Sequence, residues 1–322
     1  MSRQRIPDAV LAAAHARLQA RAARNWPEAD RLRAEIEAAG WRIVDTGTDF
    51  ALSPAAAPTV EEEGTVRFGS SSAVPSRLDE PATGLATVVL VATDWPADLD
   101  RALDGLGRTS PDGVAVVVVG DGPSAEQDAA LAAVAGRPTV EVVRTSQRLG
   151  QAAALNAGLR RVSAGVVIVL DTSVEPTGDI VTPLVAALDD PTVGVVGGWG
   201  IVSDDLRRFS DAPPGDVTAI EGYAIAFRRA DIAARGPLDE HFRFYRNLDI
   251  WWSLVLRDEG EDASPRRALA VELPATRHEH RGWTSLPEEE RDRLSKRNFY
   301  RIIDRFGWRR DLLVAGGLAD AD

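Results

Sequence analysis

Five short runs rich in valine, isoleucine and leucine recur between residues 87 and 196, and segments with helical spacing separate them. Runs that are apolar at nearly every position are typical of strands buried on both faces, as in a parallel sheet covered by helices. The predicted strands are Thr87–Ala92, Val114–Val119, Val140–Val143, Val166–Leu170 and Val193–Val196. The predicted helices lie near Ala97–Leu106, Ala125–Ala135 and Ala152–Arg161. The sequence therefore predicts an α/β fold with a mainly parallel sheet.

Composition excludes several kinds of site. The chain of 322 residues has no cysteine, which excludes disulfides, zinc–thiolate sites and cysteine nucleophiles, and its four histidines argue against a three-histidine metal site. The net charge of −12 argues against binding nucleic acid over the whole surface. No run of about 18 apolar residues occurs, and the first residues lack the apolar core of a signal peptide. We therefore expect a cytoplasmic protein without a membrane span.

The region before the predicted sheet differs in composition. Residues 1–52 are rich in alanine and arginine, and their spacing predicts a helical hairpin that ends at Gly40. Residues 41–45 and 49–52 are then expected to pair as a short β-hairpin. Residues 53–84 contain four prolines and an acidic run, which predicts a flexible linker. The α/β domain is expected to span residues 85–314, followed by a tail over 315–322.

Part of the N-terminal region resembles a known family. The residues that carry the likeness are Ala23–Trp26, Ala29–Asp30, Leu32–Arg33, Gly40 and Asp45–Thr48. Over residues 7–52 the segment resembles the C-terminal tail of cysteinyl-tRNA synthetases, where it belongs to the anticodon-end region. Eight arginines against seven acidic residues over 1–52 give RNA binding little support. We favour the alternative, a hairpin that packs or interacts through its apolar stripe.

Polar residues follow the predicted strands, and the carboxyl ends of parallel strands are where such sheets bind ligands. Four of these positions are Thr93-Asp94, Asp121, Arg148 and Asp171, and each set follows a different strand. A carboxylate directly after a buried strand suits Mg²⁺ or Mn²⁺ bridged to a diphosphate. The alternative for Asp171 is a turn role, because Asp-Thr-Ser is also favourable turn chemistry.

Six motifs follow one another in an order that is typical of one enzyme family. They are Thr87–Asp94; Gly120–Ser124; Arg148–Gly150 with Asn156–Gly158; Leu170–Pro176; Glu221–Arg229; and Leu238–Glu240 with Asp249. Over about residues 85–310 this series resembles family 2 glycosyltransferases with the GT-A fold. The resemblance implies a hexosyltransferase that moves a sugar from a nucleotide-diphosphate donor to a glycan, lipid or protein acceptor. It also implies inversion at the sugar and assistance by Mg²⁺ or Mn²⁺.

The resemblance assigns roles to individual residues. The donor-binding residues would be Thr93, Asp94, Asp121, Arg148, Asn156 and Asp171, with Asp121 near the nucleobase. The metal-binding residues would be Asp171, Ser173, His278 and His280. The catalytic carboxylates would be Asp249, Asp239 and Glu240, and the acceptor side would contain Glu221, Gly222, Trp251 and Trp252. Adjacent helix positions point about 100° apart, so one of the two tryptophans is expected in the core and the other in the acceptor pocket.

Three positions depart from the family pattern. Gly120 stands where an acid is common, and Ser173 replaces the second aspartate of the Asp-x-Asp motif. Arg246-Asn247 replaces a Glu-Asp pair, and asparagine cannot act as a general base. Asp249 is then the candidate base or acceptor ligand. The alternative is an acid that favours the start of a helix.

These departures leave a second function open, a catalytically impaired module of the same fold that binds a ligand or partner without sugar transfer. A dinucleotide-dependent oxidoreductase shares the α/β layout. It is disfavoured because no predicted strand is followed by Gly-x-Gly-x-x-Gly. We favour the enzyme.

Overall fold

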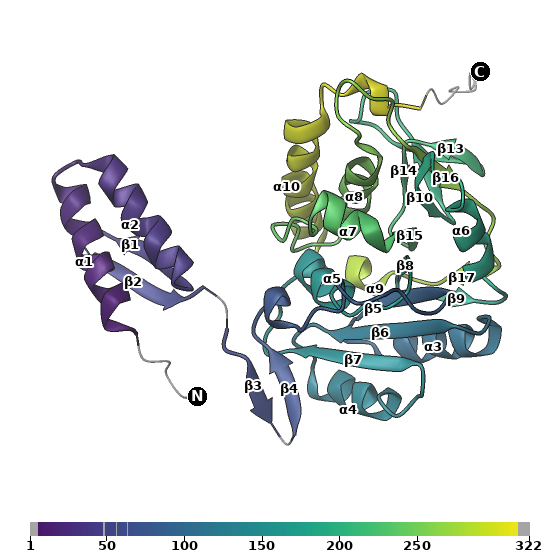
Figure 1. Cartoon of the computed structure of the whole chain (residues 1–322), viewed down its shortest axis with the longest axis horizontal. Helices are drawn as coiled ribbons and strands as arrows, with labels where there is room; N and C mark the ends of the chain where they lie inside the picture. Colours follow the sequence, from purple (N-terminus) through teal and green to yellow (C-terminus); the bar gives the residue numbers. More distant parts are fainter. Residues whose placement is uncertain (1–5, 48, 56, 63, 315–322) are drawn as a thin grey trace. The chain divides into compact units, whose positions relative to one another are not determined.

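The computed structural model describes residues 6–314 apart from 48, 56 and 63 (Figure 1). The chain divides into two compact units, Met1–Ser70 and Ser71–Asp322. Thr48 and the predicted tail over 315–322 lie outside the described residues. None of the helices in the described residues combines the length and hydropathy needed to cross a bilayer.

The N-terminal unit is built from two helices and a β-hairpin. Its elements are α1 (Asp8–Ala22), α2 (Trp26–Ala38), β1 (Trp41–Thr46) and β2 (Asp49–Pro54). The Asn25 side chain accepts a hydrogen bond from the Glu28 N–H and so caps α2. Gly40 has a φ of 77°, which allows the chain to turn directly into β1. Val10, Ile36 and Trp41 share one small core, and the predicted helical hairpin is confirmed.

The stretch predicted to be a flexible linker contains ordered structure. β3 (Val60–Glu62) and β4 (Thr65–Phe68) form an antiparallel hairpin. From the short helix η1 (Ser71–Ala73) onward the chain belongs to the second unit, where Val74 is buried. The N–H groups of Arg77 and Thr83 donate to the carbonyls of Arg160 and Ser163 at 2.7 and 2.8 Å. These partners lie some 80 residues away, so local composition could not reveal them.

A mixed sheet organises the second unit. Its strands are β5 (Ala86–Ala92), β6 (Val114–Gly120), β7 (Val140–Thr145), β8 (Val166–Leu170), β10 (Val193–Gly197), β13 (Gly215–Val217), β15 (Ala224–Arg228) and β16 (Arg267–Ala270). Within the unit they follow the order β13-β16-β10-β15-β8-β5-β6-β7. β5 pairs in parallel with β6 and β8, β6 with β7, and β10 with β16, whereas β15 is antiparallel to both of its neighbours. The predicted α/β fold with a mainly parallel sheet is confirmed.

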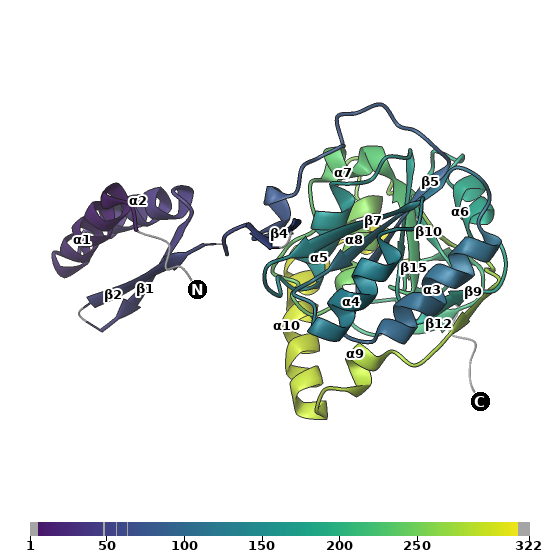
Figure 2. The same ribbon diagram turned by 90° about the horizontal axis from the view of Figure 1, so that it is seen from below.

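Helices cover both faces of this sheet, and Figure 2 shows α3 and α4 on one of them. α3 (Pro96–Thr109), α4 (Ala125–Val134) and α6 (Val181–Ala187) pack with alternate residues of β5, β6 and β8 in one core. α5 (Gln151–Leu159) and α8 (Leu248–Arg257) contact the other face, and α10 (Glu288–Phe306) packs on α8. The remaining elements are β9 (Val174–Pro176), β11 (Gly200–Val202), β12 (Ser210–Ala212), β14 (Ala219–Ile220), α7 (Arg229–Arg235), β17 (Ala275–Arg277), α9 (Arg281–Thr284) and η2 (Arg310–Leu312). Each predicted strand therefore lies between two helical layers, which explains its uniform hydrophobicity.

The close approach of α5 to the sheet gives a first prediction. A Cβ on Gly158 would lie 2.6 Å from Val89 Cγ1 and 2.9 Å from Val119 Cγ2. Gly158→Ala is therefore expected to lower the free energy of unfolding by about 1–3 kcal/mol through overpacking. Gly107→Ala is the matched control, because nothing lies within 4 Å of its Cβ position and the exposed helix should gain about 1 kcal/mol. Urea unfolding followed by tryptophan fluorescence measures both changes, and a neutral Gly158→Ala would contradict the packing.

Candidate active site

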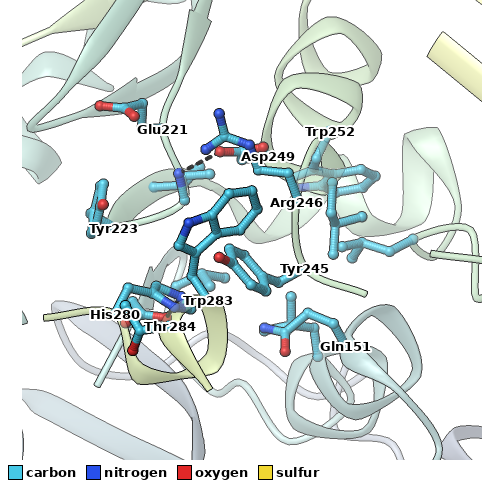
Figure 3. A pocket seen from close by; sticks show the side chains of 17 residues that line it. Gln151, Glu221, Tyr223, Tyr245, Arg246, Asp249, Trp252, His280, Trp283 and Thr284 are labelled. Atoms are coloured by element: carbon cyan, nitrogen blue, oxygen red, sulfur yellow. Dashed lines mark hydrogen bonds and ion pairs between the residues drawn. The ribbon is translucent and has the colours of Figure 1, made fainter. Parts of the chain in front are cut away.

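A cavity of about 350 Å³ opens at the carboxyl end of β8, between α5, α8 and α9. Polar groups from four different segments line it, as Figure 3 shows for Glu221, Tyr245, Asp249 and His280. Asp171, the residue directly after β8, also lies in its wall. The cavity thus lies at the sheet edge where the sequence predicts a ligand site.

Strand pairing brings His280 to Asp171. β17 pairs with β9 in antiparallel register, with Arg277 opposite Val174. His280 lies three residues after Arg277, and Asp171 lies three residues before Val174. The His280 Nε2 therefore comes within 3.3 Å of Asp171 Oδ2. Burial disfavours the charged form of both groups, but their mutual attraction outweighs it, so the pKa of Asp171 is lowered and the pKa of His280 is raised.

Ser173 and His278 have other contacts. The Ser173 hydroxyl and N–H both donate to Asp171 Oδ1, at 2.5 and 2.8 Å. The serine therefore orients the aspartate, and it stands where the family pattern has a second carboxylate. His278 Nε2 lies 2.9 Å from Glu175 Oε2. Of the two predicted histidines, only His280 reaches Asp171.

Asp249 lies in the first turn of α8 and faces the same cavity. Its carboxylate accepts hydrogen bonds from the Gly222 N–H at 2.8 Å and from the Ile250 N–H at 2.9 Å. Burial raises the pKa of Asp249. Burial and the nearby Asp249 carboxylate also raise the pKa of Glu221. Asp249 thus lies in the first turn of a helix, where an acidic residue is favourable, and it also lines the cavity.

Asn247 has a structural role at the position where the family pattern has an acid. Its φ of 69° places it in the left-handed region, which asparagine tolerates better than most residues. Its Nδ2 donates to the Ser295 carbonyl of α10 at 3.0 Å. The residue therefore turns the chain into α8 and anchors that turn.

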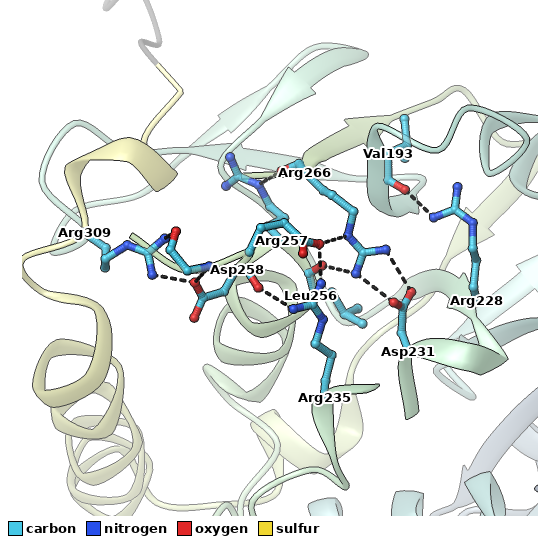
Figure 4. Close-up of polar contacts among 11 residues, drawn as sticks. Val193, Arg228, Asp231, Arg235, Leu256, Arg257, Asp258, Arg266 and Arg309 are labelled. Carbon is cyan, nitrogen blue, oxygen red and sulfur yellow. Dashed lines mark hydrogen bonds and ion pairs between the residues drawn. The ribbon is translucent and has the colours of Figure 1, made fainter. Parts of the chain in front are cut away.

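The far end of α8 is held by a network of arginines (Figure 4). Arg257, the last residue of the helix, donates to the carbonyls of Thr218 and Leu312 at 2.7 Å each. Burial lowers the pKa of Arg257 to about 10. Arg266 pairs with Asp231 at 2.8 Å beside it. Because α8 is fixed at both ends, the position of Asp249 is fixed with it.

Part of the region that carries this cavity matches a known family, and Asp249 and His280 lie beyond the matched part. Residues 87–244 match the family described as glycosyl transferase family 2. This stretch, just under half of the chain, is similar to family 2 glycosyltransferases. No curated protein matches the chain.

Three solved structures align with parts of this chain. GalNAc-T7 with UDP, GalNAc and Mn²⁺ aligns with a TM-score of 0.56 at 18% identity, covering 70% of this chain and 49% of that one. The mannosyltransferase PcManGT from Pyrobaculum calidifontis, in complex with GDP-Man and Mn²⁺, has a TM-score of 0.48 at 20% identity, covering 62% and 56%. S. aureus TarS 1-349 with UDP has a TM-score of 0.47 at 13% identity, covering 68% and 72%. The chain spans about half the length of the first two structures. The first alignment supports the GT-A-like fold.

Of the six predicted donor-binding residues, Asp171 lines the cavity and the other five do not. Asp94 pairs with Arg148 at 2.5 Å and accepts the Ser124 N–H at 2.9 Å, and Thr93 precedes it, half-buried. Asp121 accepts the N–H groups of Leu149 and Gly150 at 2.7 and 2.9 Å. Burial raises the pKa of Asp121. The structure thus joins Asp94 to Arg148, and it ties Asp121 to the backbone next to Arg148.

Asn156, Asp239 and Glu240 hold a loop together and do not line the cavity. The Asn156 amide exchanges hydrogen bonds of 2.9 Å with the Leu238 backbone and donates to Glu240 Oε1 at 3.0 Å. Asp239 contacts His241 at 2.6 Å and Arg301 at 3.2 Å. Asp239 and Glu240 share a loop with Leu238, and Asn156 of α5 binds that loop. Of the loop's three motif residues, Leu238 is the one that lines the cavity.

The two tryptophans of α8 have different surroundings. Trp252 lines the cavity, and Trp251 packs against Phe242 with ring centroids 5.3 Å apart. Both are buried. This arrangement agrees with the expected divergence of adjacent helix positions.

Several cavity residues have no counterpart in the sequence prediction. Tyr245 stacks on His280 with ring centroids 4.2 Å apart, and Trp283 lies beside Arg246, whose guanidinium is 5.4 Å from the ring. Asn298 of α10 donates to the carbonyls of Phe244 and Arg246 at 2.8 Å each and so holds this loop. Tyr245 and Arg246, just before Asp249 in the sequence, could have been predicted as cavity residues from their closeness to that candidate base. Nothing in the sequence of α10 marks Asn298 as buried.

Proposed function

We propose that this chain transfers a hexose from a nucleotide-diphosphate donor to an acceptor hydroxyl. The observation that carries the proposal is that Asp249 and the Asp171–His280 pair face one cavity at the carboxyl end of β8. The family 2 match over residues 87–244 supports it. The complexes of GalNAc-T7 with UDP, GalNAc and Mn²⁺ are consistent with it at the level of the fold.

Asp249 is the proposed general base. A base must reach the proton that it removes and have a pKa near the working pH, and burial moves the pKa of Asp249 in that direction. The N–H groups of Gly222 and Ile250 hold the carboxylate in place, and a proton moves to it from the acceptor hydroxyl. The hydroxyl oxygen then bonds to the anomeric carbon as the bond to the diphosphate oxygen breaks. One such displacement inverts the anomeric centre.

Asp171 and His280 are the proposed ligands of a divalent metal ion. Their facing atoms are 3.3 Å apart, close to the spacing of neighbouring ligands that each lie about 2.1 Å from one ion. Within the described residues, no group of three or more acidic or histidine side chains is placed to hold a metal. Mg²⁺ and Mn²⁺ commonly complete their shells with waters and substrate phosphates, so two protein ligands fit. The ion would offset the charge on the leaving diphosphate.

A nucleotide-binding panel tests the proposal. UDP-, GDP- and dTDP-sugars, each with and without Mn²⁺, are added to the full chain in a thermal-shift experiment. A ligand at a hundred times its Kd stabilises the folded protein by roughly 2.7 kcal/mol, a shift of a few degrees. Donors that bind are then tested for release of the nucleoside diphosphate with glycan, lipid and protein acceptors. No shift with any donor would contradict the proposal.

The second candidate is a binding module without sugar transfer. It is favoured by Ser173, which orients Asp171 but adds no charge to the metal site. A module of this kind binds a nucleotide sugar but releases no nucleoside diphosphate with any acceptor. The same panel therefore separates the two functions.

For the N-terminal unit we propose a packing or interaction role. Arg17 and Arg21 pair with Asp45 at 2.7 and 3.2 Å, and Arg31 and Arg33 pair with neighbouring glutamates. Arginines neutralised in this way offer little attraction to phosphate. The likeness to cysteinyl-tRNA synthetases and the cytoplasmic location both stay predictions.

The pH dependence of transfer tests the role of Asp249. A general base works only when it is deprotonated, so transfer falls as the pH drops through the pKa of Asp249. Burial raises that pKa, so the fall is expected at a higher pH than the value near 3.9 of an ordinary aspartate. The profile of kcat/KM against pH measures it in the free enzyme. A rate that stays constant down to about pH 4 would contradict the assignment.

A further inference from the structure

The cavity lining contains both polar and apolar side chains. In Figure 3, Trp252 and Gln151 lie on the opposite side of the cavity from Glu221 and Tyr223. Six apolar side chains line the cavity together with the polar groups already described. They are Leu155, Val169, Ile225, Leu238, Leu248 and Trp252, which we call the apolar recess.

The fold explains why these side chains line the same cavity. Val169 of β8 and Ile225 of β15 are direct cross-strand partners, so they point to the same face of the sheet. Leu248 and Trp252 are four residues apart on α8, so they lie on one face of that helix. Leu155 belongs to α5, which contacts the same face of the sheet as α8. Two helices, two strands and the loop that carries Leu238 therefore build the recess.

The recess offers few hydrogen-bonding groups to a ligand. Five of its six side chains are purely aliphatic, and all of these except Val169 are at most 5% exposed. The sixth, Trp252, is 3% exposed, and its indole Nε1 is buried without a hydrogen-bond partner among the described residues. A sugar hydroxyl held against the five aliphatic side chains would lose its water and find no partner there, which costs about tenfold to a hundredfold in affinity. A methyl or alkyl group of the same size would lose nothing and would gain burial.

We propose that the recess binds an apolar group of the substrate, attached close to the reacting sugar carbon. Two sources share this chemistry: the methyl group of a deoxyhexose on the donor, or an alkyl chain on the acceptor. The inference rests on the proposed function and deepens it, because it names the class of substrate that the cavity selects. The polar wall would contact the hydroxyls of that substrate, and the recess would contact its apolar part.

The donor arm of the test uses pairs of nucleotide sugars that differ by one hydroxyl. These are GDP-mannose with GDP-6-deoxymannose, UDP-galactose with UDP-6-deoxygalactose, and dTDP-glucose with dTDP-6-deoxyglucose. Calorimetric titration of the full chain with Mn²⁺ is expected to show at least about tenfold tighter binding of the deoxy member of one pair. Free UDP, GDP and dTDP serve as the reference for nucleotide binding alone.

The acceptor arm uses methyl and octyl glycosides of the same sugar in the nucleotide-release assay. A KM at least about tenfold lower for the octyl glycoside, with both members of each donor pair bound equally, assigns the recess to the acceptor. Equal donor binding together with equal KM values would overturn the inference and leave the proposed function standing. Absence of nucleotide binding and transfer would overturn both.

Val169→Thr adds a hydroxyl to the recess with almost no change of shape. It is expected to reduce the preference for the apolar substrate over its hydroxylated counterpart by about threefold or more. The reason is that the new threonine hydroxyl can form a hydrogen bond with the hydroxyl of that counterpart. Val166→Thr is the matched control, since Val166 is a half-buried valine of the same strand that lies outside the cavity lining. Unchanged affinity for the free nucleoside diphosphate shows that each variant is folded. An equal effect of the two substitutions would contradict the assignment.

Discussion

Asp249→Asn is expected to lower the rate of sugar transfer by about 10²–10⁴-fold, the usual contribution of a general base. The amide has nearly the same shape, and its oxygen can still accept one of the two N–H groups that hold the carboxylate, from Gly222 and Ile250. It cannot take up a proton from the acceptor. Steady-state release of the nucleoside diphosphate measures the loss, and titration with the donor alone should show unchanged binding.

Asp239→Asn is the matched control for Asp249→Asn. Both aspartates belong to the predicted set of catalytic carboxylates, but Asp239 contacts His241 and Arg301 and does not line the cavity. We expect it to reduce stability slightly and to leave kcat unchanged. If Asp239→Asn abolished transfer and Asp249→Asn did not, the roles proposed from the cavity would be reversed.

The fold could be predicted because its signal is repeated along the chain. The strands β5, β6 and β8 are runs of almost entirely apolar residues, and the helices between the strands cover both faces of the sheet. The linker over 53–84 was the weakest part of the prediction. Its order depends on backbone hydrogen bonds to Arg160 and Ser163, which no local pattern encodes.

Members of the candidate site could be predicted only where a residue's place at the end of a strand or the start of a helix determines where its side chain points. Asp171 directly follows β8, and Asp249 lies in the first turn of α8. Both side chains line the cavity. Asn156 and Glu240 also belong to predicted motifs, yet neither lines the cavity, because the Asn156 amide donates to Glu240 and accepts the Leu238 N–H. The choice between His278 and His280 follows from the register of β17 on β9, which pairs residues a hundred positions apart. The order of the motifs therefore indicated the sheet edge where the cavity lies, and the register of β17 on β9 determined which histidine reaches Asp171.

The second large effect is expected for Asp171→Asn, which should remove the metal-dependent part of nucleotide-sugar binding and lower transfer by more than about a hundredfold. The amide oxygen can still accept from Ser173, so the turn after β8 should stay folded. The amide lacks the negative charge that would attract a divalent ion and that now attracts His280. Thermal shifts with each donor, with and without Mn²⁺, measure the metal dependence directly.

Two histidine variants complete this experiment. His280→Ala is expected to weaken the metal dependence, since His280 is the proposed second ligand. His278→Ala should leave the metal dependence unchanged, because His278 pairs with Glu175 instead. Unaltered metal-dependent binding in Asp171→Asn would remove Asp171 from the metal site. Loss of metal dependence in His278→Ala but not in His280→Ala would instead show that β17 holds the other histidine against the donor, in a register different from the pairing of Arg277 with Val174.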